Sequence, residues 1–510
     1  MMESIKSRFA VSFFANLVRG GLTFVTAIFL ARWLGPTDFG KMSFLLGVFM
    51  AVRGFLDMGS SQAFFTLLSR RPRTRRFIAI FWGFIAIQLI VGLLLLFVLL
   101  PDSLMLALWS EESRVLLVLA FVATFMQGTV WTLAANMAEA SRETIRAQKI
   151  NTAVVVMHLV VVAVLALMGE LAVPLVLAAL VVEWSVAAWF ASRLYVTQVD
   201  VVSTQNVDRD TPGSVFREIY VYCLPLLPTT IFVFAHDFAD RWMLQRWAGA
   251  TEQAYFSVAQ QYSSVALLAT ASMLRILWKE IAEAHHLKNM QRVGMLYQRA
   301  SRQLFFVGAF LAGGLQPLAS ELLNLTVGQA YVSGTLTMLI MLLYPVHQSM
   351  GQIGGTMMFA TGHTKVYAMC TCVSILLGLV LAYFMLAPAD APVPGLHLGA
   401  EGLALKLVGV QIFSVNLLGW MIARIFGWRF DWNYQIFALA GCLGFGWLSH
   451  YFISLCFGET GTLWISLSLQ AFIYTGLIGF YLYFSPWLVS LTREEYVMFL
   501  EKLRRLAAIK

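Results

Sequence analysis

Long apolar runs recur along the whole chain, and they restrict its fold more than any other feature. Predominantly apolar stretches of about 18 residues or more follow one another through most of its length, and runs of this length predict membrane-spanning helices. The composition agrees, because 59% of the 510 residues are hydrophobic and 12% are charged, whereas soluble proteins carry about a quarter of charged residues. We therefore expect an all-α polytopic membrane protein.

About fourteen spans can be placed on these runs. The first run continues to about residue 34, which is too long for the core of a signal peptide, so we interpret it as a retained span. The expected spans are 10–34, 40–69, 77–100, 115–138, 150–169, 172–195, 218–245, 253–280, 295–320, 331–360, 366–387, 400–424, 433–457 and 462–485.

The basic residues predict the orientation of the chain. With a cytoplasmic N-terminus, 26 of the 35 Lys and Arg residues fall on the cytoplasmic side, five fall outside and four lie within spans. The positive-inside rule then places both termini in the cytoplasm. The net charge of +8 is accounted for by this topology, and nucleic-acid binding is not expected because no soluble domain carries a basic face.

A short motif occurs twice, between two pairs of apolar runs. Residues 32–43 read RWLGPTDFGKMS, and residues 246–257 read RWAGATEQAYFS. Arg, Trp, Gly, Thr and Ser recur in register without a gap, so each copy predicts a tight turn between two helices. Six expected spans separate the copies, and an even number preserves orientation. We therefore expect two parallel repeats that face each other across a central cavity, with the two motifs equivalent.

The repeat suggests a domain organisation. Residues 1–195 form the first six-helix lobe, the polar segment 196–217 is a cytoplasmic linker, and 218–427 form the second lobe. Two further spans occupy 428–487. The last segment, 488–510, is expected to be an amphipathic cytoplasmic tail that starts with a capping box at Thr492-Arg493-Glu494-Glu495.

Several short sequences in the chain resemble those of a known family. The sequences LARWLGPTDFG at 30–40, FLDMG at 55–59 and AYFSVA at 254–259 are similar to the polysaccharide-transport (Wzx-type) branch of the MOP flippase superfamily, whose fold is MATE-like. The pair Asp240-Arg241, followed by Gly249, adds to the resemblance. It implies a flippase that moves undecaprenyl-diphosphate-linked oligosaccharide across the bacterial inner membrane by alternating access of two lobes.

Three arginines in the spans are the main candidates for substrate binding. The related lipid II flippases carry cavity arginines on spans 1, 2 and 8, and Arg19, Arg53 and Arg275 match those positions. An arginine in the hydrocarbon costs at least about 2.5–3.5 kcal/mol, so it should face a wet cavity or a partner. A diphosphate would supply the opposite charge to their guanidinium groups. The alternatives are that Arg53 pairs with Asp57 and that Arg19 and Arg275 extend toward the cytoplasmic surface.

Other polar residues complete the expected site. Asn16 and Asp57, close to the first two arginines, join the substrate-binding set. Lys406 joins it too, although a position near Glu401 also suits a paired or snorkelling lysine. For coupling to Na⁺ or H⁺, the candidates are His236, Asp237 and Asp240 on span 7. The alternative for Asp240 is an ion pair with Arg241.

Further residues suggest no separate chemistry. Span 11 offers Thr371 and Ser374 but no carboxylate, which counts against a sodium site shared with span 7. His158 and Glu183 are each read as hydrogen-bonded core residues, and His347 as a residue lining the second lobe. The five cysteines lie within spans without metal-site or redox spacing, so no metal site or other cofactor is expected, and no ATP-binding motif is present.

A flippase for surface polysaccharide, whether O-antigen of lipopolysaccharide, capsule or exopolysaccharide, is therefore the leading interpretation. It would be a monomeric inner-membrane transporter rather than an enzyme. Its expected partners are the bilayer, a lipid-linked oligosaccharide, a polysaccharide polymerase and glycosyltransferases. One alternative is an ion-coupled multidrug exporter of the same fold, against which cavity arginines count. The other is a membrane glycosyltransferase or polymerase, which would need a large external loop.

Overall fold

The structure is a computed structural model that describes residues 5–70, 73–109, 112–199, 211–457, 463–496 and 498. Regular structure throughout this part of the chain is helical. Twelve segments there are long and apolar enough to cross a membrane. Two of them, Phe14–Asp57 and Pro212–Leu267, have 44 and 56 residues, about twice what one crossing requires. The twelve segments therefore agree with the expected fourteen spans.

The chain divides into two compact units. Unit 1 comprises Met1–Ser257 and Leu379–Leu403, and unit 2 comprises Val258–Gly378 and Ala404–Lys510. The lobe boundaries expected from the sequence differ from this division and stay a prediction.

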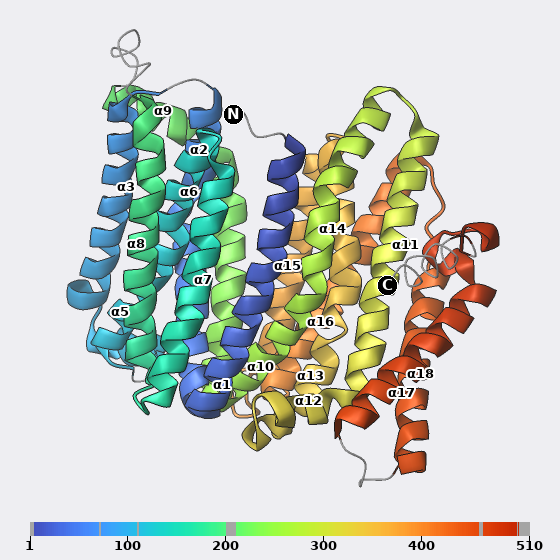
Figure 1. Cartoon of the computed structure of the whole chain (residues 1–510). Helices are drawn as coiled ribbons and strands as arrows, with labels where there is room; N and C mark the ends of the chain where they lie inside the picture. The colour runs from blue at the N-terminus through green and yellow to red at the C-terminus, as the bar shows by residue number, and fades with distance from the viewer. Residues whose placement is uncertain are drawn as a thin grey trace. The chain divides into compact units, whose positions relative to one another are not determined.

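Unit 1 is a bundle in which α1 packs against α5 and α7, while α8 packs against α5, α6 and α7 (Figure 1). Its first helices are α1 (Ile5–Asp57), α2 (Ser60–Arg70), α3 (Arg75–Leu94), η1 (Leu95–Leu99), α4 (Asp102–Trp109) and α5 (Arg114–Phe125). They are followed by η2 (Met126–Val130), α6 (Trp131–Ala140), α7 (Thr144–Leu167), α8 (Val173–Val199), α9 (Pro212–Cys223), η3 (Leu224–Leu226) and the first part of α10 (Leu227–His286).

The two copies of the sequence motif adopt the same backbone conformation. Gly35 in α1 has φ 75° and ψ 170°, and Gly249 in α10 has φ 87° and ψ −179°. Only glycine populates this region readily, and each residue is the one point of non-helical backbone inside its helix. The copies also touch, since a Cβ atom on Gly40 would lie 1.8 Å from the carbonyl oxygen of Ala250. The predicted turn in each copy is therefore confirmed, and both turns lie at the same end of unit 1; their equivalence within two repeated lobes stays a prediction.

Several spans of unit 1 are less regular than expected. The second span is broken, because Met58 and Gly59 have positive φ and end α1 before α2 starts. The seventh expected span begins irregularly, because Pro225 lies in the 3₁₀ turn η3. The fourth span contains the π-helical segment η2, and such segments often mark functional positions in helices.

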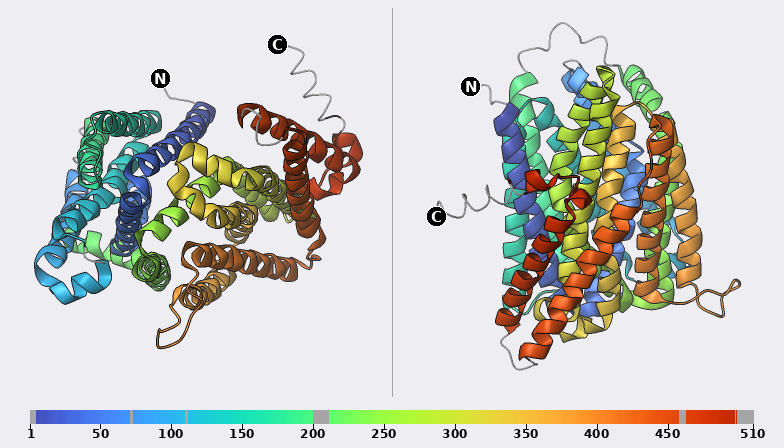
Figure 2. Two further views of the ribbon diagram at one scale, coloured as in Figure 1. Left: turned by 90° about the horizontal axis from the view of Figure 1, so that it is seen from below. Right: turned by 90° about the vertical axis from the view of Figure 1, so that its right-hand side faces the viewer.

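Unit 2 is organised around α11, which packs against α14 and α17, while α18 packs on α17 (Figures 1 and 2). Small residues allow the closest approach: a Cβ atom on Gly446 of α17 would lie 1.9 Å from the carbonyl oxygen of Gly313 in α11, as expected for helices packing in lipid. After α10 the helices are α11 (Met290–Leu315), η4 (Gln316–Leu318), α12 (Ala319–Thr326), η5 (Gln329–Gly334), α13 (Thr335–Met341) and α14 (Tyr344–Ala360). They continue with α15 (Thr364–Leu386), α16 (Gly399–Phe426), α17 (Asn433–Phe457), α18 (Leu463–Phe484) and η7 (Pro486–Val489).

Two local features of unit 2 have clear causes. The tenth expected span breaks between α13 and α14, where Pro345 lies in the first turn of α14, and the Ser263 hydroxyl donates to the carbonyl of Met341 at 2.5 Å. After η7, the Thr492 backbone N–H donates to Glu495 Oε2 at 2.9 Å, and the Glu495 N–H donates to Thr492 Oγ1 at 3.2 Å. The predicted capping box is confirmed; most of the tail beyond it lies outside the described residues.

Candidate functional site

Arg53 occupies a position that a glycine of another helix leaves open. Its side chain extends from α1 to η2, where a Cβ atom on Gly128 would lie 2.3 Å from Arg53 Cδ, 2.4 Å from Nε and 2.7 Å from Cζ. The side chain is half-buried, and no described residue forms an ion pair or hydrogen bond with it. Arg53 is therefore a charged group within a predicted span whose guanidinium is available to a ligand.

Asp57 does not neutralise Arg53, although the two are four residues apart. Its Oδ1 accepts hydrogen bonds from the Ser60 hydroxyl at 3.0 Å and from the Ser61 backbone N–H at 3.0 Å and hydroxyl at 2.5 Å. The carboxylate thus caps the first turn of α2, where the positive end of the helix dipole lies. The i,i+4 pair with Arg53 that was considered as an alternative is not formed, because the carboxylate is turned toward Ser60 and Ser61 instead. A direct substrate role for Asp57 stays a prediction.

Arg19 is held between α1 and α7. Its Nη1 donates to Gln148 Oε1 at 3.0 Å, and its Nη2 donates to Asn16 Oδ1 on the same helix. Both partners are neutral, so the hydrogen bonds orient the guanidinium and leave its charge uncompensated. Asn16 and Arg19 are therefore brought together as predicted positions. Gln148 was not predicted, since a glutamine at the start of a span carries no signal that distinguishes it from a solvated residue.

The remaining members of the expected binding set lie in unit 2. Arg275 is part of α10, and its side chain is outside the described part of the structure. Lys406 lies on α16 and is 1% exposed. Their participation in a common site with Arg19 and Arg53 stays a prediction.

The three coupling candidates form a cluster on the unit 1 part of α10. His236 Nδ1 lies 3.0 Å from Asp237 Oδ1, and His236 Nε2 lies 3.9 Å from Asp240 Oδ2. Arg241 follows them: its guanidinium stacks over Phe256 at 5.0 Å from the ring centroid, and Nη1 donates to the Ser257 hydroxyl at 3.1 Å. No cluster of His, Cys, Asp or Glu side chains suited to a metal ion occurs in the described part of the chain.

A second buried polar pair connects α7 and α8. His158 Nδ1 lies 2.8 Å from Glu183 Oε2, and the two side chains are 13% and 4% exposed. Each side chain is hydrogen-bonded, as expected. The two had been treated separately, however, and the structure shows that they are partners of each other. The pairing could not be read from the sequence, because it depends on the register of two packed helices.

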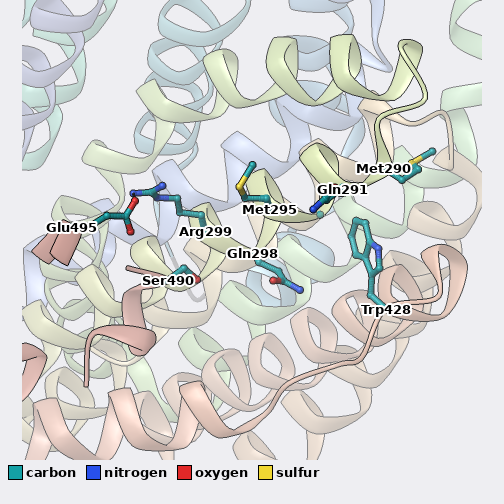
Figure 3. A pocket seen from close by; sticks show the side chains of 9 residues that line it. Met290, Gln291, Met295, Gln298, Arg299, Trp428, Ser490 and Glu495 are labelled. Atoms are coloured by element: carbon teal, nitrogen blue, oxygen red, sulfur yellow. Dashed lines mark hydrogen bonds and ion pairs between the residues drawn. The ribbon is translucent and has the colours of Figure 1, made fainter. Parts of the chain in front are cut away.

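A pocket of about 490 Å³ in unit 2 (Figure 3) contains none of the expected site residues. Arg299 and Glu495, 3.4 Å apart, lie at one end, and Trp428 and Met290 lie at the other. The hydrogen bond from the Thr492 N–H, with Arg299 nearby, lowers the pKa of Glu495. The pocket's opposite charges offset each other, so it is a poor site for a dianionic head group. It is lined by Met290, Gln291, Gly294, Met295, Gln298, Arg299, Trp428, Ser490 and Glu495.

The fold of this chain is similar to those of solved multi-pass membrane transporters. The chain is similar to the lipid II flippase MurJ in an inward closed conformation, with a TM-score of 0.68 and 12% identity over 93% of this chain and 98% of the other. It is also similar to an inward-facing multidrug resistance MATE family transporter of the MOP superfamily, with a TM-score of 0.63 and 16% identity over 80% and 94% of the two chains. At these identities the similarity shows the fold.

The sequence defines the family more narrowly. Residues 5–276 match the family described as polysaccharide biosynthesis protein, and the chain belongs to this family. A MOP superfamily transporter from Pyrococcus furiosus, whose binding pocket is described as reversed in polarity, is similar in fold with a TM-score of 0.55, 14% identity, and coverage of 84% of this chain and 97% of that one. No curated protein matches the sequence.

Proposed function

We propose that this protein is a flippase that moves polyprenyl-diphosphate-linked oligosaccharide from the cytoplasmic to the outer face of the bacterial inner membrane. The observation that carries the proposal is the pair of uncompensated guanidinium groups, Arg19 and Arg53, within one membrane-spanning unit. Neither has an acidic partner among the described residues, whereas a diphosphate presents oxygens that match guanidinium donors in pairs. Membership of a polysaccharide biosynthesis family supports a sugar-bearing substrate.

In this mechanism the arginines hold the diphosphate, the oligosaccharide occupies the hydrated cavity and the polyprenyl chain stays in lipid. The substrate enters from the cytoplasm, and two lobes rock about the bound head group to open the site outward. Arg275, Asn16 and Lys406 contribute further contacts. The polymer is a surface polysaccharide, assembled with glycosyltransferases and a polymerase as the partners that supply and consume the substrate.

The alternative function is an ion-coupled multidrug exporter. The similarity to a MATE family transporter and the acidic side chains of Asp237 and Asp240 favour it, since carboxylates suit cationic drugs. The cationic groups at Arg19 and Arg53 disfavour it, because they repel a cation in a medium of low dielectric constant. A membrane glycosyltransferase is not favoured by any feature of the site.

The test is complementation of a flippase-null strain at matched membrane abundance of each variant. Arg53→Ala and Arg19→Ala should each lower surface polysaccharide at least tenfold, which corresponds to losing about one hydrogen-bonded charge contact of 1.4 kcal/mol or more. Arg53→Lys should recover part of the activity, since lysine keeps the charge but not the planar fork. Arg275→Ala tests whether the third predicted arginine, which lies in unit 2, also contributes to substrate binding.

Arg193→Ala is the matched control, because that arginine stacks over Trp189 at 4.6 Å on an exposed part of α8 and should be dispensable. Full surface polysaccharide from all three alanine variants of the site would refute the diphosphate contact. Resistance to cationic drugs without any restoration of polysaccharide would support the exporter instead.

A further inference from the structure

The His158–Glu183 pair is the least expected polar feature of unit 1. Glu183 is 3% exposed, and while its Oε2 contacts the imidazole at 2.8 Å, its Oε1 is buried and has no hydrogen-bond partner. A buried carboxylate oxygen that lacks a partner costs free energy. Retaining an ionisable residue in this state within a membrane span points to a function, because a glutamine or a leucine would be easier to bury.

The pair can bind one proton beyond those of its resting state. With one proton shared between the two side chains, the pair is either imidazole with carboxylic acid or imidazolium with carboxylate, and carries no net charge. Adding a proton gives imidazolium with carboxylic acid, net charge +1. The added proton binds the free oxygen of Glu183 or the ring nitrogen, so no other reactant is needed. Proton uptake therefore changes the charge at the contact between α7 and α8.

Other charged groups on the packed helices lie far along them from this pair. On α7 the nearest, Lys149, is nine residues away, and on α8 Arg193 is ten residues away. At about 1.5 Å per residue these distances along the axis are on the order of 14 Å. The helices packed against α7 and α8 carry no charged group that forms an ion pair with His158 or Glu183 among the described residues. The charged residues with described side chains on these helices are Arg19, Arg32, Asp38, Lys41, Arg53 and Asp57 on α1, Arg114 on α5 and Glu139 on α6; η2 has none.

A short series of contacts connects the pair to Arg53. Trp184, the residue after Glu183, packs edge-on against Trp131 with ring centroids 5.4 Å apart. Trp131 is the first residue after η2, and Gly128 within η2 forms the surface on which the Arg53 guanidinium rests. The segment η2 itself packs against α5, α6 and α8. The residue after Glu183 thus contacts the end of the segment whose backbone sets the position of Arg53.

The π-helical form of η2 supplies an element that can change state. A π-turn contains one residue more than an α-turn, and it persists only where the surrounding packing favours it. A shift of α8 against η2 would alter that packing and with it the space beside Gly128.

We propose that His158 and Glu183 form a proton-binding site that couples proton uptake to the binding of the lipid diphosphate at Arg53, through η2. This rests on the proposed function and names its coupling ion as H⁺. It also places coupling in unit 1 between α7 and α8, apart from the His236 cluster on α10. Because coupling is reciprocal, diphosphate binding must raise the proton affinity of the pair by the same factor as protonation raises diphosphate affinity.

Infrared difference spectroscopy of the full-length protein in lipid nanodiscs, titrated with pH, tests proton binding without transport. The wild type should show a protonated carboxyl band that appears with acidification. Glu183→Gln should lack it, and His158→Asn should shift its midpoint. Glu321→Gln is the matched control, since Glu321 also has a buried oxygen without a partner but no histidine contact; this variant should keep the band. A band unchanged in Glu183→Gln would overturn the site.

Adding undecaprenyl diphosphate as the probe tests coupling. It should move the midpoint of the Glu183 band upward by about one pH unit, a tenfold change in proton affinity that lies within the usual range of coupling. The shift should vanish in Arg53→Gln. A titrating Glu183 band without any shift in the wild type would refute the coupling. Failure of the protein to restore surface polysaccharide in cells would count against the proposed function alone, because the infrared midpoints do not depend on it.

Discussion

At the residue scale, the charge of the candidate site is set by small neighbours and local caps. Arg53 has its place because residue 128 lacks a side chain, and it keeps its charge unpaired because Asp57 is engaged by Ser60 and Ser61. The arginines themselves could be predicted, since charges inside long apolar runs stand out. Gly128 could not, because a glycine on a separate helix reveals nothing of what it faces until the helices are packed.

Gly128→Ala is predicted to lower activity without unfolding the protein. The new Cβ atom would overlap the outer part of the Arg53 side chain, at 2.3 Å from Cδ, and this flexible end can move aside. Alanine also favours a helix. We expect surface polysaccharide to fall about tenfold, as for loss of one charged hydrogen-bonded contact, with an unchanged unfolding midpoint. Gly83→Ala in α3, where nothing lies within 4 Å, serves as the control. Full activity of Gly128→Ala would show that the position of Arg53 is unimportant.

At the scale of the element, the duplicated turn shows how a local sequence pattern determines structure. The glycine of each copy has the same rare backbone conformation. The turn could therefore be predicted from the sequence, since its key residue acts through its own φ and ψ. The break after Asp57 and the π-turn η2 could not be predicted from the sequence, because they depend on contacts such as that of Gly59 with Leu226.

Alanine at either turn glycine is predicted to destabilise the protein through the backbone alone. Neither Gly35 nor Gly249 has any atom within 4 Å of a new Cβ, so the whole cost is conformational, about 1–3 kcal/mol for each. Both Gly35→Ala and Gly249→Ala should lower the thermal unfolding midpoint in detergent. The helical Gly83→Ala should raise the midpoint slightly, because alanine in a helix adds about 0.5–1 kcal/mol of stability over glycine. Equal midpoints for the turn variants and the control would contradict the assignment.

The capping box after η7 is predicted to weaken in acid. The hydrogen bond from the Thr492 N–H lowers the pKa of Glu495 below its usual value of 4.5. The carboxylate therefore stabilises this turn fully above pH 4.5, and the contribution is lost as the pH falls through the lowered value. Amide hydrogen exchange of residues 492–496, corrected for its intrinsic pH dependence, should reveal opening in that range. In Glu495→Gln the protection against exchange should show no loss in that pH range. If the loss persisted in this variant, another titrating group would be responsible.

At the scale of the whole molecule, the apolar runs and the distribution of charge determined what could be predicted. The expected spans agree with the observed segments, because length and hydropathy are local properties. The contact between His158 and Glu183 arises only when α7 and α8 are aligned, and no property of either segment reveals that register. The fold was therefore largely predictable, and the connections within the site were not.

The topology is the last prediction, and it follows from the charges and the turns together. The two turns touch within unit 1, so both must face the same side of the membrane, and the placement of 26 of the 35 Lys and Arg residues predicts that this side is the outer one. In a cysteine-free background, an impermeant maleimide should label Thr37→Cys in intact spheroplasts, because Thr37 is exposed beside Gly35. Arg75 is the exposed first residue of α3, in the basic connection that follows the second span, and Arg75→Cys should react only after permeabilisation. The reverse pattern would invert the chain, place the basic segment 70–76 outside, and move Arg19 away from the cytoplasmic entrance that the flippase mechanism requires.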